Sequence, residues 1–195
     1  MSQSGVILYG PPGSGKDTVT AELTRLQPEF ALFERLKAGP GRTTGYRLTT
    51  TAHIDQLSRD GELLYRNARY DAEYAIDRPG VAALVEGGRV PVLHMGQVAG
   101  AKAVAAFPLH WIRVLLWCPV ATTESRSVGR GDTDVDARVK VWHETREDLL
   151  AHETEPWTLT LRTEALGPAE AARAILEAVT QGAPAEPRNV RELVR

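Results

Sequence analysis

Short apolar runs alternate along the chain with segments whose apolar residues recur every three or four positions. The run GVILYG at residues 5–10 is bounded by glycines and continuously apolar, which predicts a strand buried on both faces of a parallel sheet. Three further runs predict strands in the same way: VPVLHM at 90–95, WIRVLLWC at 111–118 and TLTLR at 158–162. The tryptophans in and near these segments are expected in the core.

The segments between these strands predict helices. Val19, Leu23 and Leu26 share one helical face, and Pro28 ends that helix. Residues 78–88 predict a helix with Asp77 as its N-cap and Pro79 in its first turn. The same pattern predicts helices over 54–64, 134–152 and 168–180. Because strands and helices alternate, we expect an α/β fold with a central parallel sheet flanked by helices.

Two regions have no clear pattern. Residues 30–36 predict a short strand, but the glycine- and cation-rich segment that follows, 37–47, predicts a loop. We expect residues from about 37 to 77 to form one long irregular subdomain on the core. Residues 182–195 have no clear core face and are predicted to be a mobile tail.

Composition excludes several classes of protein. Among the 195 residues, 23 lysines and arginines against 25 acidic residues give a net charge of −2, so no overall field favours nucleic acid or an anionic membrane. One cysteine excludes an intramolecular disulfide and a cysteine-rich zinc site. We see no signal-peptide pattern and no apolar run of the roughly 18 residues that a spanning helix needs. We therefore expect a cytoplasmic protein.

The segment GPPGSGKDT at residues 10–18 is the strongest chemical motif. It joins a predicted buried strand to an amphipathic helix, where free N–H groups can bind phosphate oxygens. Glycines allow close approach of the backbone, and a lysine adds positive charge. A chance turn is a poor alternative because strand, loop, lysine and helix all agree. We predict nucleotide binding by this P-loop: Gly10, Pro11, Pro12, Gly13, Ser14, Gly15, Lys16, Asp17 and Thr18.

Asp17 occupies the position where P-loops usually carry the hydroxyl that contacts Mg²⁺. A carboxylate there suits the helix dipole, and Thr18 supplies a hydroxyl one position later, so Thr18 is the predicted metal ligand. The form Gly-Lys-X-Thr is similar to that of adenylate kinases and favours a small-molecule kinase. The strand at 90–95 ends in His94, with Gln97 beyond it, and not in a carboxylate. We therefore expect Mg²⁺ to be held mostly by phosphate oxygens and water.

From residue 5 to residue 179 the chain resembles the guanylate kinase family of P-loop nucleoside monophosphate kinases. RLKAGPGRTTGYR is similar to the loop that leads to a phosphate-binding tyrosine, here Tyr46, and GELLYRNARYDAEYAID places Tyr74 on a second one. HMGQVAGAKAV resembles a segment that places Gln97 on the family's aspartate. SRSVGRGDTDVDARV resembles the arginine-bearing lid. The resemblance implies one P-loop kinase domain over residues 1–181, with an acceptor-binding insert at about 35–77 and a lid at about 120–138.

The positions that read guanine in the family differ here. The resemblance places Tyr65, Ile76 and Gln97 where the family has a glutamate, a hydroxyl and an aspartate. A carboxylate accepts both N–H groups on the edge of guanine, which these three side chains cannot do, so guanine specificity is in question. A small shift of the alignment would bring Glu62 or Glu73 to the site instead. Asp17 is also shared with the ribose 1,5-bisphosphate kinases, which favours a sugar-phosphate acceptor as an alternative.

Cations at two places suit phosphoryl transfer, which depends on alignment and positive charge. Arg126, Arg130 and Arg138 lie in the lid-like segment and, with Lys16, are the predicted catalytic residues. The predicted acceptor-binding residues are Arg35, Arg42, Tyr46, Tyr65, Arg69, Tyr74 and Gln97. Solvated surface arginines are the alternative at each cationic position.

The sequence thus predicts an ATP- and Mg²⁺-dependent kinase that phosphorylates a small phosphorylated acceptor, foremost a nucleoside monophosphate. A sugar-phosphate kinase is one alternative. A non-catalytic binding module with a guanylate kinase fold is another, although such modules lose the working P-loop that is present here. The protein is expected to be a monomer or a homodimer.

Overall fold

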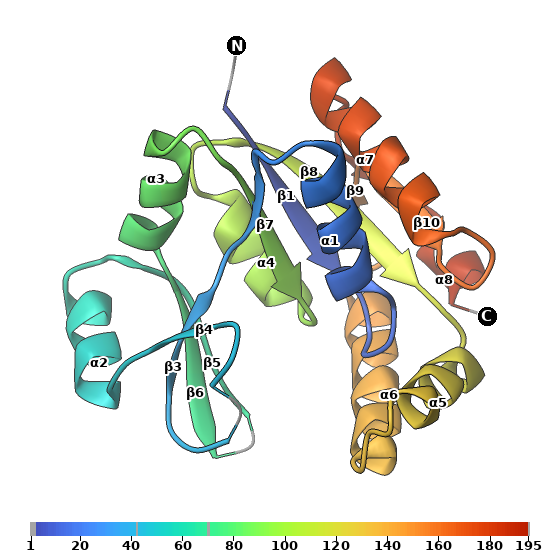
Figure 1. The fold of residues 1–195 in the computed structure, drawn as a ribbon, viewed down its shortest axis with the longest axis horizontal. Coiled ribbons are helices and arrows are strands. Elements are labelled where there is room, and N and C mark those ends of the chain that lie inside the picture. The colour runs from blue at the N-terminus through green and yellow to red at the C-terminus, as the bar shows by residue number, and fades with distance from the viewer. Residues whose placement is uncertain (1–2, 42, 70, 195) are drawn as a thin grey trace.

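The computed structural model describes residues 3–41, 43–69 and 71–194, and its centre is a five-stranded sheet (Figure 1). The strand order is β10-β8-β1-β7-β2, and every neighbouring pair is parallel. The strands are β1 (Ser4–Tyr9), β2 (Phe30–Leu32), β7 (Val90–Met95), β8 (His110–Trp117) and β10 (Leu159–Arg162). The predicted α/β class with a central parallel sheet is confirmed.

Side chains of β1 alternate between two helical layers, as successive residues of a strand must. Val6 and Leu8 pack with α1 (Lys16–Leu26) and α7 (Pro168–Gln181). Ile7 and Tyr9 face the opposite layer. That layer contains α3 (Arg78–Glu86), α4 (Val98–Ala105) and α6 (Val135–Ala151). Both faces of β1 are therefore buried, which explains its continuous apolar run.

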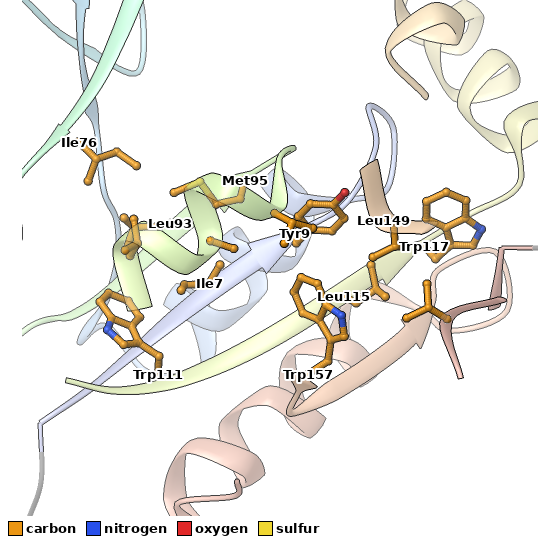
Figure 2. Packing of buried hydrophobic residues seen from close by; sticks show 14 of the residues in the cluster. Ile7, Tyr9, Ile76, Leu93, Met95, Trp111, Leu115, Trp117, Leu149 and Trp157 are labelled. Atoms are coloured by element: carbon orange, nitrogen blue, oxygen red, sulfur yellow. The ribbon is translucent and has the colours of Figure 1, made fainter. Parts of the chain in front are cut away.

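The tryptophans form much of the apolar cluster that also contains Ile7 and Tyr9 (Figure 2). Trp111, Trp117, Trp142 and Trp157 are all buried, as predicted. The rings of Trp117 and Trp142 lie 5.1 Å apart, as do those of Tyr9 and Trp157. Tyr9 is the residue directly before the P-loop, so this aromatic packing holds the end of β1 in place.

The predicted N-cap of α3 is also present. The Asp77 carboxylate accepts a hydrogen bond from the backbone N–H of Gly80 at 2.9 Å. It also pairs with the guanidinium of Arg47, which lies on β4 (Tyr46–Leu48) in the segment predicted as the insert. Asp77 thereby joins the insert to the core.

The expectation that residues 37–77 are irregular is wrong. They belong to a second, four-stranded sheet of order β4-β3-β6-β5, which packs with α2 (Thr51–Arg59). Its strands are β3 (Arg35–Ala38), β4 (Tyr46–Leu48), β5 (Leu63–Arg69) and β6 (Ala72–Asp77). The predicted strand at 30–36 is divided between the two sheets, and the predicted helix at 54–64 begins and ends earlier. Period-2 alternation is weak here because many strand residues are polar and face a cavity rather than a core.

The last residues of the described chain also pack on the core, contrary to the expected absence of a core face. β11 (Glu186–Pro187) pairs with β9 (Pro156–Trp157), and the short helix α8 (Val190–Leu193) follows. Val190 and Val194 are 1% and 2% exposed. Two buried valines and the partly buried Leu193 are too few to produce a recognisable periodicity. Elsewhere in the chain, helix α5 (Val120–Gly129) comes directly before α6.

Deletion of residues 185–195 is expected to lower the free energy of unfolding by about 3–6 kcal/mol, because burial of each valine contributes about 1.5–3 kcal/mol. The deletion also removes the hydrogen bond from Arg146 Nε to the carbonyl of Val194, 3.1 Å long. Urea unfolding followed by tryptophan fluorescence measures the change. Glu186→Ala, at an exposed position, is the control. An unchanged midpoint in the deletion variant would show that the tail contributes nothing to the core.

Within the part of the chain that the structure describes, no helix has both the length and the apolar character needed to cross a bilayer.

Candidate functional site

The P-loop, residues 10–18, connects the carboxyl end of β1 to the first turn of α1. Gly10 passes so close to β8 that an added Cβ would lie 2.2 Å from the carbonyl oxygen of Leu116. Gly13 has φ of +73°, a conformation that favours glycine. Helix α1 begins at Lys16, so its free N–H groups open onto the loop. The strand-loop-helix context expected for phosphate binding is present.

The Lys16 ammonium is held inside this loop. Its Nζ donates hydrogen bonds to the carbonyl oxygens of Gly10 at 2.7 Å and Pro11 at 2.8 Å. Burial lowers the pKa of Lys16 to about 8, while nearby Asp17 partly opposes that shift. The lysine is therefore still mostly charged at neutral pH.

Two cavities meet at the P-loop. We call the first the arginine cavity; its volume is about 580 Å³, and it lies between the P-loop, the start of α1 and the arginines of the α5–α6 segment. We call the second the tyrosine cavity; its volume is about 220 Å³, and it lies between the P-loop, the end of β7, the second sheet and α6. Lys16 and Pro12 line both cavities. Lys16 therefore lies in the wall that the two share.

The arginine cavity contains the predicted catalytic arginines. Arg126, Arg130 and Arg138 all line it, together with P-loop residues that include Asp17 and Thr18. Arg126 is firmly held, because its guanidinium donates to the carbonyl oxygens of Gly13 at 2.7 Å and of Thr163 at 2.6 Å. The predicted lid is thereby joined directly to the P-loop.

Arg130 and Arg138 share a carboxylate. Asp132 pairs with Arg130 at 2.7 Å and with Arg138 at 3.3 Å. The hydrogen bond from Arg130 is the main cause that lowers the pKa of Asp132. Arg138, one turn into α6, also pairs with Asp134 at 2.8 Å. These pairs hold both guanidinium groups on the cavity wall without burying them.

The tyrosine cavity contains six of the seven predicted acceptor residues. Those six come from four different strands and one helix start: Arg35, Tyr46, Tyr65, Arg69, Tyr74 and Gln97. The rings of Tyr46 and Tyr74 lie 5.4 Å apart, and the Arg35 guanidinium lies 5.4 Å from the Tyr74 ring. Arg42, the seventh, lies outside the described residues.

Of the three positions that the resemblance aligns with guanine-binding residues, two line the tyrosine cavity and one does not. Tyr65 donates a hydrogen bond to Gln97 Oε1 at 2.6 Å, so these two side chains engage each other, and burial raises the pKa of Tyr65. Ile76 is buried in the core instead. Glu73 pairs with Arg66 at 2.9 Å, away from the cavity. None of the described residues that line the tyrosine cavity carries a carboxylate.

His94 lies near the end of β7, the strand beside β1, and lines the tyrosine cavity. Its Nε2 lies 2.8 Å from the Thr20 hydroxyl, and its Nδ1 lies 3.6 Å from Asp17 Oδ1. Burial, followed by the charge of Lys16, lowers the pKa of His94 to about 3. A neutral imidazole, and not a carboxylate, therefore lies beside the P-loop near the end of β7.

Sequence reasoning missed Asn67 and Thr145 as cavity residues. Asn67 lies on β5 between Tyr65 and Arg69, which also line the cavity. Residues two apart on a strand share a face, so the β5 spacing would have identified Asn67 once that strand was recognised. Thr145 comes from α6, and its place at the cavity had no local signal.

Metal binding would depend on few protein groups. Over residues 3–41, 43–69 and 71–194, no group of three histidine, cysteine or acidic side chains is arranged to hold an ion. Asp17 and Thr18 are exposed and line the arginine cavity. These oxygens suit Mg²⁺, which commonly keeps several waters and binds through substrate phosphates.

No protein-family model and no curated protein matches this sequence. Among solved structures, the guanylate kinase from Anaplasma phagocytophilum is 14% identical, with a TM-score of 0.63 over 97% of this chain and 89% of that chain. The shikimate kinase from Acinetobacter baumannii in complex with shikimate is 15% identical, with a TM-score of 0.47 over 92% of this chain and 94% of that one. The chain has the fold of a guanylate kinase-like P-loop kinase, as its sequence predicts.

Proposed function

We propose that the protein is an ATP-dependent phosphotransferase that moves the γ-phosphoryl group of ATP to a small phosphorylated acceptor. The observation that carries this proposal is the position of Lys16 in the wall shared by the two cavities. A donor in the arginine cavity and an acceptor in the tyrosine cavity would meet at this ammonium. Phosphoryl transfer needs donor and acceptor to be aligned, with positive charge between them.

The arginine cavity would hold the donor. The P-loop amides and Lys16 bind the phosphates of ATP, and the guanidinium groups of Arg126, Arg130 and Arg138 neutralise charge on the migrating group. An acceptor oxygen forms a bond to the γ-phosphorus as the bond from that phosphorus to the bridging oxygen breaks, and ADP leaves. The intact P-loop argues against a purely non-catalytic binding module.

The tyrosine cavity would hold the acceptor. Arg35, Tyr46 and Tyr74 bind its phosphate, and the P-loop side of the cavity presents it to the donor. Arg69, and Arg42 from outside the described residues, complete the proposed cationic set. The acceptor is a nucleoside monophosphate or a sugar phosphate, both of which carry the phosphate that this set would bind.

Mg²⁺ would enter with ATP and neutralise part of the charge on its phosphates. The Thr18 hydroxyl is the proposed protein ligand, because it is exposed in the arginine cavity. The adjacent Asp17 carboxylate is within reach of the same solvent-filled space and would favour a hydrated ion.

A panel of acceptors tests the proposed function. The purified protein is incubated with ATP, Mg²⁺ and, separately, each nucleoside monophosphate and a set of pentose and hexose phosphates, and ADP release is coupled to NADH oxidation. At least one acceptor is expected to stimulate ADP release well above the rate of ATP hydrolysis alone. Release that no acceptor stimulates would contradict the proposal.

The affinity for ATP is expected to weaken above pH 8. The charged form of Lys16 prevails below its pKa of about 8 and is lost as the pH rises through that value. Bound phosphates favour the charged form, so linkage weakens binding by up to about tenfold per pH unit above the pKa. Calorimetric titration at pH 7, 8 and 9 measures this change. Lys16→Arg stays charged over this range, and it should bind ATP with little change in affinity from pH 7 to pH 9. A wild-type affinity that is also unchanged would contradict the assignment.

A further inference from the structure

Asn67 places an unpaired oxygen at the wall of the tyrosine cavity. Its Oδ1 atom is buried and has no hydrogen-bond partner within the described chain, and the residue lines the cavity from the middle of β5. Buried side-chain oxygens are usually paired, and an unpaired one costs free energy. A ligand group that donates a hydrogen bond to this oxygen would remove that cost.

Three of the groups that line the cavity with Asn67 are cations, which donate hydrogen bonds and accept none. Lys16, Arg35 and Arg69 contribute cations to the same cavity. Tyr65 and Gln97 are bonded to each other at 2.6 Å. The described lining contains no carboxylate, so it lacks the group that accepts both N–H groups on the edge of guanine in the related kinases. The cavity thus suits an anion that also carries a hydrogen-bond donor of its own.

The size of the cavity restricts that ligand further. Its volume of about 220 Å³ lies below the range of about 300–1,000 Å³ that is typical of sites for drug-sized ligands. A phosphate joined to one sugar ring suits this volume better than a phosphate joined to both a sugar and a base. A sugar hydroxyl is also a donor that the Asn67 oxygen can accept.

We propose that Asn67 is a specificity-determining residue that accepts a hydrogen bond from a hydroxyl group of the acceptor, and that this acceptor is a phosphorylated sugar without a nucleobase. The proposal rests on the proposed phosphotransferase function and names the acceptor class of the same site. The cations of the cavity bind the acceptor phosphate, and Asn67 selects the hydroxyl-bearing ring beside it.

The first experiment needs no variant. Initial rates with ATP are compared for pentose and hexose phosphates and for the four common ribonucleoside monophosphates. The best sugar phosphate is expected to have kcat/KM at least tenfold above that of every nucleoside monophosphate. If a nucleoside monophosphate, including AMP, has the highest kcat/KM, this inference is overturned while the proposed function stands. If no acceptor stimulates ADP release, the proposed function itself is overturned.

The second experiment isolates the hydrogen bond. Deoxy analogues of the best sugar phosphate are compared in the wild type and in Asn67→Ala. Removal of one particular hydroxyl should lower wild-type kcat/KM about tenfold or more. The same removal should change kcat/KM of Asn67→Ala by less than threefold, because the partner is already absent, and KM for ATP should stay within twofold of wild type. Equal losses in both proteins for every hydroxyl would overturn the role of Asn67.

Discussion

Substitution of Lys16 by alanine is expected to lower kcat/KM for phosphoryl transfer by about 10²–10³-fold, the loss typical when one preorganised charge is removed from a transition state. The ammonium lies between the two cavities and is already positioned by the carbonyl oxygens of Gly10 and Pro11. Its removal takes away the charge nearest to the point where donor and acceptor would meet. Steady-state rates with the acceptor found by the panel measure the loss, and calorimetry should show ATP affinity reduced at least tenfold.

Lys140→Ala is the matched control, because Lys140 is an exposed lysine of α6 that lines neither cavity. It should leave both ATP affinity and kcat/KM within twofold of the wild type. Circular dichroism and thermal unfolding establish that each variant is folded. If the wild type binds ATP only at millimolar concentration and Lys16→Ala binds it equally well, the protein is a binding module and not a kinase.

Substitution of Arg126 by alanine is expected to lower kcat by about 10³-fold, in the range known for arginines that stabilise transferring phosphoryl groups. Arg126 is the lid arginine with direct bonds to the P-loop, through the Gly13 carbonyl at 2.7 Å, and to the segment after β10, through Thr163. Its loss removes a positive charge and also releases the contact between α5 and the P-loop. The effect should appear mainly in kcat, because the P-loop amides and Lys16 still bind ATP.

Two comparisons separate charge from geometry at this position. Arg126→Lys keeps the charge but cannot reproduce a planar guanidinium that bonds Gly13 and Thr163 together, so it should recover only part of the rate. Arg162→Ala removes a nearby exposed arginine that pairs with Glu164 and lines neither cavity, and its rate should match the wild type. A wild-type rate in Arg126→Ala would show that this arginine is structural only.

The main strands of the central sheet and the P-loop could be predicted because their signals are local. A buried strand needs a continuous apolar run, and a phosphate-binding turn needs glycines and a lysine within a few residues. The predicted cation set at each cavity followed from the resemblance to guanylate kinases, and the structure brings six acceptor residues and three lid arginines to two cavities. Their roles stay predictions until the variants are measured.

Other features could not be predicted because their causes are non-local. The insert was expected to be irregular because its sequence lacks the alternation of apolar and polar residues that marks a strand packed on a core. The structure gives the reason: β5 directs Tyr65, Asn67 and Arg69 to a cavity. The tail was expected to have no core face, because the few residues that pack on the core, Val190, Leu193 and Val194, contact residues far away in sequence. Neither pattern contains enough apolar positions to be recognised by periodicity.

By itself, the sequence determined the α/β class, the P-loop with Asp17 in place of a hydroxyl, and the lack of the expected guanine-reading carboxylates at positions 65 and 97. Tertiary structure alone decided that Lys16 lies in a wall between two cavities and that Ile76 belongs to the core. It also decided that the oxygen of Asn67 has no hydrogen-bond partner among the residues that the structure describes. The physical reason is that periodicity records which face of an element is buried. The partners that meet across a cavity are set by contacts between segments that lie far apart in the chain.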